Sequence, residues 1–467
     1  MSSIFDNGTA GCSGVPAAAG SALNPKQERE IVPPEVSYDF RGDQFWRRIP
    51  GWQDVGAEDF GDYSWQQRNS VTSLPGVSKV LGTLLTDSLA KEIEAGLERT
   101  PMNVRITPYI FSLIDWSNPI DDPIRKQFLP LGSQFFEDHP CYMDDSLNED
   151  GDKATPYLTH RYPDKALFLP ITLCPVYCSY CTRSRVVGGS TAVKSKSTYG
   201  AKNQEWDSTF EYIRNNPQIE DIVISGGDAF LLRPAQIKQI GMTLLDIPHI
   251  RRLRFATKGL AIMPMKILSD TKWTAALDEV VQTGRKRMKE VCIHTHFSTE
   301  NEMSAWTLLA MEELVNRGIK VRNQSVLIRG VNNEFEVMYR TIKKLAYLNI
   351  QPYYIYTHDM VPGCEHLRTT LGQAEELSKK LQGTIAGFNT PRTVCDAPGG
   401  GGKREVSSYD SYDRTRGISS WKAPSVKGEE TFFYYDPIDQ LSEEGREFWR
   451  NREGLEERLA EVKSNLR

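Results

Sequence analysis

Short apolar runs alternate with longer helical patterns through the middle of the chain, and this alternation constrains the fold more than any other feature. Strands are expected at 166–172, 221–225, 253–257, 291–296, 321–327 and 352–357, with helical patterns between them. Such alternation is typical of parallel strands joined by right-handed crossovers. Six units favour an α/β fold with a partial (β/α)6 TIM-type barrel, although an open doubly wound sheet has the same rhythm.

The composition along the chain predicts four regions. Residues 1–36 are rich in glycine, alanine, serine and proline and are expected to form a flexible N-terminal arm. Residues 37–160 form a mainly helical N-terminal region, and 161–390 hold the barrel. Residues 391–467 carry a glycine-rich loop with a lysine and a polar tail, whose last stretch, 442–467, has the pattern of one charged helix.

Charge and cysteine usage narrow the class of protein. A net charge of −5 over 467 residues gives no sign of a nucleic-acid or membrane partner. Eight cysteines, three of them bunched, suit free or metal-bound thiols in a reducing compartment better than a disulfide framework. The first residues lack the apolar core of a signal peptide, and no apolar run is long enough to span a bilayer. We therefore expect a cytoplasmic protein.

Three cysteines, Cys174, Cys178 and Cys181, follow the first expected strand with C-x3-C-x2-C spacing. Three thiolates can hold three irons of a [4Fe-4S] cluster and leave the fourth iron open to a substrate or cofactor. A structural zinc site is the alternative, but such a site needs four protein ligands. The nearest upstream imidazole is His160, and no cysteine or histidine follows within a plausible loop.

A glycine turn, Ser225-Gly226-Gly227-Asp228, follows the second expected strand. Ligand chemistry in parallel α/β folds gathers at the carboxyl ends of strands, where the cysteine loop is also expected. Glycines let the backbone approach a ligand closely, and a carboxylate can bind an ammonium group. Beside an open iron, this turn would hold the amino group of S-adenosylmethionine (SAM); alone, it is equally typical of a tight turn.

A run of four glycines separates Asp396-Ala397-Pro398 from Lys403. The simple interpretation is a flexible linker that ends in an unremarkable lysine. The functional interpretation is a lysine that binds pyridoxal 5′-phosphate (PLP) as a Schiff base and must move aside for the substrate amine, a freedom that glycines supply. Arg161 and Lys165, just before the first strand, could bind the phosphate or polarise the pyridine ring, or could be ordinary surface charges.

Together these residues resemble the lysine 2,3-aminomutase family of radical SAM, PLP-dependent enzymes, over about residues 52–403. The matching motifs include Trp65-Gln66, Ile106-Thr107-Pro108-Tyr109, His160-Arg161-Tyr162-Pro163-Asp164, the three cysteines with Thr182-Arg183, Ser225-Gly226-Gly227-Asp228, His294-Thr295-His296-Phe297, Asn323-Gln324-Ser325, Tyr353-Tyr354-Ile355-Tyr356 and Asp396 to Lys403. The resemblance implies a radical SAM barrel with a C-terminal extension that carries the PLP lysine.

The resemblance also implies a role for each matching residue. The implied roles are cluster ligands for Cys174, Cys178 and Cys181; SAM binding for Ser225, Gly226, Gly227, Asp228, His296 and Gln324; PLP binding for Lys403, Arg161, Lys165, Gln324 and Tyr356; and substrate binding for Arg183, Asp359 and Asp396. Arg183 matches the arginine that binds the α-carboxylate, and the two aspartates match the acids that bind the distal ammonium of lysine. Lys403 is the implied catalytic residue.

The resemblance predicts an isomerase that moves the α-amino group of a basic amino acid to the β-carbon, converting L-lysine to L-β-lysine. Arginine or ornithine, or a lysine within a partner protein, are alternative substrates, and both acids could instead pair with local cations. A zinc-binding protein is the alternative outside enzymes. An electron donor such as flavodoxin or ferredoxin and a homo-oligomeric state are also expected.

The chain departs from the family pattern at three places. Glu334 stands where well-known members have a zinc-binding cysteine, and no cysteine follows Cys395, so zinc is not expected. Thr257-Lys258 replaces a Ser-Arg pair expected near SAM, and Lys165 replaces an arginine.

Overall fold

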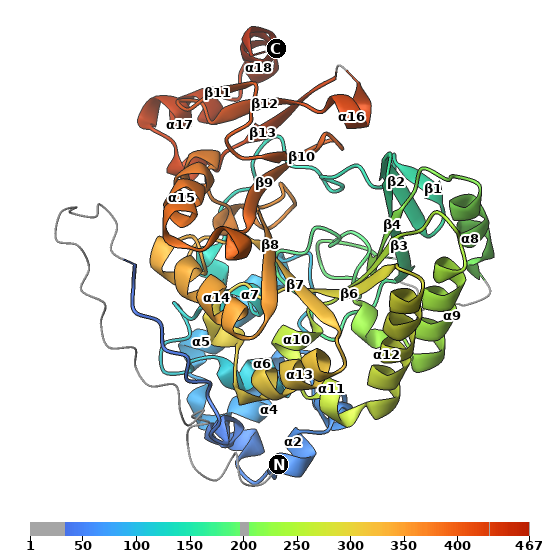
Figure 1. Cartoon of the computed structure of the whole chain (residues 1–467). Helices are drawn as coiled ribbons and strands as arrows, with labels where there is room; N and C mark the ends of the chain where they lie inside the picture. The colour runs from blue at the N-terminus through green and yellow to red at the C-terminus, as the bar shows by residue number, and fades with distance from the viewer. Residues whose placement is uncertain (1–32, 197–204, 429, 467) are drawn as a thin grey trace, which may run out of the picture.

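A ten-stranded sheet forms the centre of the computed structural model, which describes residues 33–196, 205–428 and 430–466 (Figure 1). Its strands lie side by side in chain order, and the sheet does not close, since β1 and β10 are its two edges. The strands are β1 (Lys153–Thr155), β2 (Leu158–Tyr162), β3 (Lys165–Ile171), β4 (Asp221–Gly226), β5 (Arg252–Ala256), β6 (Glu290–Thr295), β7 (Lys320–Val326), β8 (Ile350–Tyr356), β9 (Arg392–Ala397) and β10 (Gly402–Glu405).

The strands from β3 to β9 run parallel, and the pairs β1–β2, β2–β3 and β9–β10 are antiparallel. Helices cross between successive parallel strands: α8 (Asp207–Arg214), α9 (Pro234–Leu245), α10 (Gly259–Ile262), α11 (Lys266–Ser269), α12 (Thr271–Lys286), α13 (Ala305–Asn316), α14 (Phe335–Tyr347) and α15 (Leu371–Thr384). The mixed α/β fold with a mostly parallel sheet is confirmed. All six expected strands are present, and β9 adds a further parallel strand.

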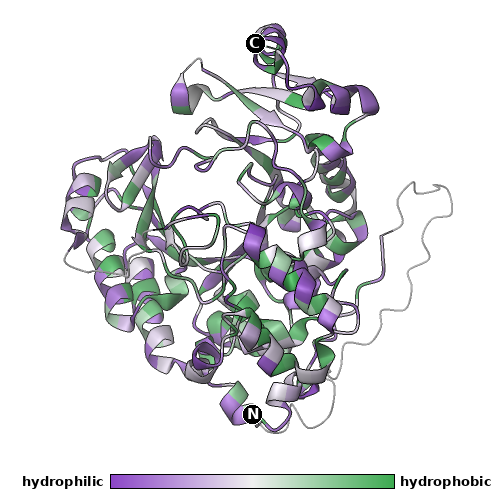
Figure 2. Cartoon of the chain, turned by 180° about the vertical axis from the view of Figure 1, so that it is seen from behind, coloured by the Kyte–Doolittle hydropathy of each residue, from purple (hydrophilic) through white to green (hydrophobic). Residues whose placement is uncertain are grey.

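Side chains alternate between the two faces of the sheet, as the pleat of a strand requires. On β4, Ile222 and Ile224 are fully buried in the hydrophobic core, whereas Asp221, Val223 and Ser225 line a cavity inside the curve of the sheet. The covering helices have one apolar face; on α14, Met338, Ile342 and Leu345 are buried at helical spacing. Figure 2 shows the resulting mixture of apolar and hydrophilic residues on these helices.

Two smaller layers extend the barrel. The N-terminal region consists of short helices: α2 (Ala57–Phe60), α3 (Tyr63–Arg68), α4 (Leu74–Leu81), α5 (Asp87–Arg99), α6 (Pro108–Leu113) and α7 (Pro123–Phe128). Helices α2, α4 and α6 lie toward the lower end of the molecule in Figure 1, and α5 and α7 lie higher. A three-stranded antiparallel sheet of β11 (Ser411–Asp413), β12 (Ile418–Lys422) and β13 (Thr431–Tyr435) lies at the other end with α16 (Pro424–Lys427). Of the expected flexible arm, residues 1–32 lie outside the described residues.

The expectation of one C-terminal helix was wrong. The structure has two, α17 (Glu443–Arg450) and α18 (Leu455–Asn465), and Gly454 between them has a φ of +63°. This left-handed conformation breaks the helix, and glycine adopts it readily because it has no Cβ. No helix among the described residues is long and apolar enough to cross a membrane.

Candidate functional site

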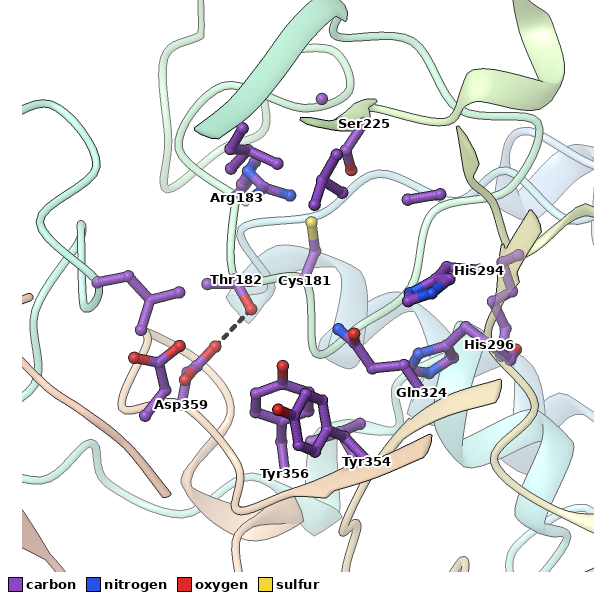
Figure 3. Close-up of a pocket in the computed structure, with 18 of the residues that line it drawn as sticks. Cys181, Thr182, Arg183, Ser225, His294, His296, Gln324, Tyr354, Tyr356 and Asp359 are labelled. Carbon is purple, nitrogen blue, oxygen red and sulfur yellow. Dashed lines mark hydrogen bonds between the residues drawn. The ribbon is translucent and has the colours of Figure 1, made fainter. Parts of the chain in front are cut away.

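One cavity of about 570 Å³ lies inside the barrel, and every residue to which the sequence analysis gave a site role lines it. Its walls come from the loop after β3, from β4, β6, β7 and β8, and from the β9–β10 hairpin. The predicted residues in its lining are Arg161, Lys165, Cys174, Cys178, Cys181, Arg183, Ser225, Gly226, Gly227, Asp228, His296, Gln324, Tyr356, Asp359, Asp396 and Lys403. Figure 3 shows ten lining residues converging from different elements. The fold thus brings together groups that are up to half the chain apart in sequence.

The three cysteines of the loop after β3 are free thiols with little exposure to solvent. Burial raises the pKa of all three, that of Cys178 to about 12, and the charges of neighbouring cysteines raise the values for Cys174 and Cys178 further. Lys258 acts in the opposite direction on Cys178, and Arg183 on Cys174 and Cys181. Partly buried thiols of this kind become thiolates when a metal compensates their charge.

The metal-binding side chains near these thiols indicate which kind of metal centre the thiols could hold. Among the described residues, no three His, Cys, Asp or Glu side chains are arranged to hold a single metal ion. A [4Fe-4S] cluster has a different requirement, because each thiolate binds its own iron. Three sulfur donors from one loop, lining a cavity with nearby cations, fit such a cluster.

The turn after β4 needs its glycines. Gly226 has a φ of +99°, and a Cβ there would lie 2.1 Å from the carbonyl oxygen of Ile171. A Cβ on Gly227 would lie 2.2 Å from the carbonyl oxygen of Leu173. No side chain fits at either position, because the turn packs directly against the backbone at the end of β3. Both glycines also line the cavity.

Asp228 connects two turns at the carboxyl ends of the strands. Its Oδ1 accepts a hydrogen bond from the amide of Phe230 at 2.8 Å, and its Oδ2 accepts one from the amide of Lys258 at 2.9 Å. Burial raises its pKa to about 6. These bonds fix the carboxylate in the wall of the cavity, where ammonium binding stays a prediction.

His296 follows the neighbouring strand β6 and Gln324 lies on β7, and both line the cavity (Figure 3). The Nε2 atom of His296 lies 2.9 Å from the hydroxyl oxygen of Tyr180, a residue of the cysteine loop. Burial, and then the charge of Lys258, lower the pKa of His296, so its ring is neutral at physiological pH. A neutral ring can accept or donate a hydrogen bond in the cavity.

Lys403 lies on β10 directly opposite Asp396 on β9. Its Nζ is 3.1 Å from Asp396 Oδ2 and 3.4 Å from the hydroxyl of Tyr162, and lies 5.6 Å from the ring centre of Tyr356. Burial lowers the pKa of Lys403, but the charges of Asp396, Tyr356 and Tyr162 and the hydrogen bond to Asp396 together outweigh burial and leave the pKa well above its usual value. An aldehyde attached to this amine would lie among three aromatic and acidic side chains that line the cavity.

The glycines before Lys403 form a hairpin turn, which differs from the flexible segment that the sequence suggested. Gly399, Gly400 and Gly402 have φ values of +86°, +88° and +81°. The amide of Gly399 donates to the carbonyl of Ser146 at 2.8 Å. The glycines therefore permit a left-handed backbone in an ordered turn that places Lys403.

The two cations predicted near the cofactor differ in their surroundings. Arg161 donates to Asp152 Oδ2 at 2.6 Å, and its Nη1 is 3.9 Å from Asp396 Oδ1. Lys165 pairs with Asp164 at 2.8 Å, and a third of its side chain is exposed. Arg161 therefore lies next to the ion pair of Lys403 and Asp396, whereas Lys165 is the first residue of β3.

The predicted substrate residues have partners within the chain. Arg183 forms a bidentate pair with Glu149. Asp359 accepts a hydrogen bond from the Thr182 hydroxyl at 2.6 Å (Figure 3), and burial, helped by the charge of Asp396, raises the pKa of Asp359 to about 7. The alternative that both acids pair with local cations holds for Asp396; among the described residues, Asp359 has no ion-pair partner.

Three of the lining residues without a role predicted from sequence contact predicted site residues. Tyr162 belongs to the motif at 160–164, but only the structure shows that it lies beside Lys403. Thr182 follows the last cysteine of the loop and gave no signal of a bond to Asp359. Glu149 belongs to no recognised motif.

The Thr257-Lys258 departure has a structural consequence. The Nζ of Lys258 lies 2.9 Å from Glu302 Oε1 and 3.0 Å from the carbonyl oxygen of His296. Both side chains are buried, Glu302 completely. Lys258 is therefore held by a buried ion pair, and its charge acts on Cys178 of the cysteine loop.

Several known 2,3-aminomutases are similar in sequence to this chain. The chain is 38% identical over 357 residues to the L-lysine 2,3-aminomutase of Acetoanaerobium sticklandii, covering 75% of this chain and 80% of that protein. It is 35% identical to the L-lysine 2,3-aminomutase of Bacillus subtilis, covering 78% of this chain and 72% of that protein. It is 31% identical to the glutamate 2,3-aminomutase of Clostridioides difficile, covering 80% and 83%. No family model matches the chain.

Proposed function

This chain belongs to the lysine 2,3-aminomutase family, and on that premise we propose that it is a radical SAM, PLP-dependent 2,3-aminomutase that converts L-lysine to L-β-lysine. One observation carries the proposal: three partly buried thiols, a lysine and two carboxylates line a single cavity. Each group has a use in this chemistry, and no simpler site requires all of them together.

When bound, the iron–sulfur cluster and SAM supply a hydrogen-abstracting radical, and PLP carries the migrating amino group. Cys174, Cys178 and Cys181 would hold the cluster, and the turn at Gly226 and Gly227 would accept SAM. Lys403 would hold PLP covalently. Here the protein contributes mainly orientation and the exclusion of water.

The acids in the cavity favour a basic substrate. The charge of Asp396 raises the pKa of Asp359. A cation between the two carboxylates would relieve their repulsion, and an anionic side chain would add to it. Asp396 pairs with Lys403 in the ligand-free protein, and a Lys403 that has reacted with an aldehyde would be a weaker partner. Asp359 and Asp396 would then hold the distal ammonium of lysine, while Arg183 orients the α-carboxylate.

An anaerobic assay tests the proposal. Reconstituted protein is incubated with SAM, PLP, a reductant and single free amino acids, and the products are separated from their β-isomers. We expect β-lysine, with arginine and ornithine as the next candidates. No product from any cationic amino acid, with glutamate converted instead, would contradict the substrate assignment; conversion of a lysine only within a protein would support the paralogue alternative.

Replacing Asp359 with asparagine is expected to raise the KM for lysine by about 10- to 100-fold, because a buried charge-assisted contact to the distal ammonium is lost. The variant keeps the shape of the residue and an acceptor for Thr182. Binding of L-2-aminohexanoate, which lacks the ammonium, serves as the control and should change little. Equal losses for both ligands would show that Asp359 does not contact the cation.

The raised pKa of Asp359 predicts a pH dependence for lysine binding. Below pH 7 this carboxyl is largely protonated and neutral, so it cannot pair with an ammonium group. Affinity for lysine should therefore rise as the pH rises from about 5.5 to 7, by up to about tenfold per unit for one linked proton, and level off above. Asp359→Asn should flatten this profile; a profile unchanged by the substitution would assign it to another group.

A further inference from the structure

We propose that Glu149 is a positioning residue that presents one edge of the Arg183 guanidinium group to the α-carboxylate of the substrate. The inference rests on the proposed function, which supplies an amino-acid substrate for the cavity. It adds a residue that no motif of the sequence singled out.

The contact between the two residues is close and buried. Nε of Arg183 donates to Oε1 and Oε2 of Glu149 at 3.1 and 2.9 Å, and Nη2 donates to Oε1 at 2.6 Å. Glu149 is only 4% exposed. Charge-assisted bidentate pairs of this kind fix the orientation of a guanidinium group as well as its place.

This geometry leaves a defined part of Arg183 for a ligand. A guanidinium group has two edges that can bind a carboxylate with two parallel hydrogen bonds: Nε with Nη2, and Nη1 with Nη2. Glu149 occupies the first edge. The side-chain hydrogen bonds of Arg183 within the described residues all go to Glu149, and none uses Nη1. Both residues line the cavity, so the second edge is the one available to a carboxylate there.

Glu149 also keeps Arg183 away from the other end of the substrate site. Asp359 lies close to this part of the loop, since the hydroxyl of Thr182, the residue before Arg183, donates to Asp359 at 2.6 Å. Without Glu149, the long arginine side chain would be drawn to Asp359, the acid proposed to bind the distal ammonium. An Arg183–Asp359 pair would block both contacts that distinguish a basic amino acid.

The backbone around Glu149 is fixed to the rest of the site. Oδ1 of Asp145 accepts from the amide of Glu149 at 3.0 Å, and Oδ2 accepts from the amide of Asp150 at 2.9 Å. The carbonyl of Ser146 accepts from Gly399 in the turn that precedes Lys403. The segment with Glu149 thus links the α-carboxylate contact to the hairpin that carries the PLP lysine.

The test is ligand binding without turnover. Wild type, Glu149→Gln and Asp150→Asn are loaded with PLP and SAM in the absence of reductant, and the dissociation constants of L-lysine and L-lysinamide are measured by calorimetry. Glu149→Gln should weaken lysine binding at least tenfold and change lysinamide binding less than twofold. Asp150→Asn is the matched control: its carboxylate is exposed, it contacts Arg185, and both constants should stay at the wild-type values. In turnover, Glu149→Gln should raise KM more than it lowers kcat.

Two outcomes would overturn the inference: unchanged lysine binding in Glu149→Gln, or an equal loss for lysine and lysinamide. Should Glu149→Gln fold poorly, the substitution is repeated in an Arg183→Lys background. There it should add no further loss of lysine affinity, and an additive loss would also overturn the proposal. If wild type binds no amino acid, the proposed function fails; if wild type binds lysine and Glu149→Gln equals it, only the role of Glu149 fails.

Discussion

Lys403→Ala is expected to abolish covalent attachment of PLP and to lower turnover of lysine by on the order of a thousandfold or more. The amine is the group that must form and release the bond to the cofactor aldehyde, and no neighbouring side chain replaces it. The measurement is borohydride trapping followed by mass spectrometry of the labelled peptide, together with the visible absorbance of the bound cofactor.

Lys427→Ala provides the matched control for Lys403. Lys427 lies beside the same turn, with its Nζ 3.4 Å from Asp152 Oδ1, but it does not line the cavity. It should keep both PLP and activity. Label retained in Lys403→Ala, or lost in Lys427→Ala, would place the cofactor on a different lysine and remove the basis of the proposed site.

Replacing Cys174, Cys178 and Cys181 together with alanine is expected to remove bound iron, the visible absorbance of the cluster and all measurable activity. These thiols are the proposed protein ligands, and a [4Fe-4S] cluster without them has no anchor in the cavity. The protein is reconstituted anaerobically, and iron, sulfide and electron paramagnetic resonance are measured. Loss of activity with iron retained would contradict the assignment.

Cys141→Ala is the control for the cysteine variant. Cys141 is a half-buried free thiol that does not line the cavity, so iron content should equal that of wild type. The same preparations test the zinc alternative. A colourless wild-type protein that binds zinc and no iron after reconstitution would favour that alternative over the aminomutase.

The glycine run before Lys403 adopts a conformation that its composition does not indicate. The sequence drew attention to Lys403 because four glycines precede it, and these were expected to provide freedom of movement. In the structure, three positive φ values instead build a turn that pairs Lys403 with Asp396 across two strands. Composition alone does not distinguish a flexible linker from an ordered turn, because glycine serves both.

The C-terminal tail also folds differently from the prediction made from its sequence. Its charged, helix-forming residues predicted one continuous helix, and Gly454 alone gave little reason to divide it. The structure divides it there, and it places Trp449 of the first helix in a fully buried position beside Tyr435. Helical propensity is a local preference, and tertiary packing decides where a helix ends.

The sequence by itself determined the order of strands and helices, the thiols of the cysteine loop and the need for glycine after β4. Each of these features depends on the spacing of a few neighbouring residues, because the local geometry of the backbone follows from that spacing. Only the tertiary structure decided which charges meet: Arg183 binds Glu149 from 34 residues away, and Thr182 binds Asp359 from 177. Partners so far apart leave no periodic signal, since the folded sheet, and not the chain, sets the distance between them.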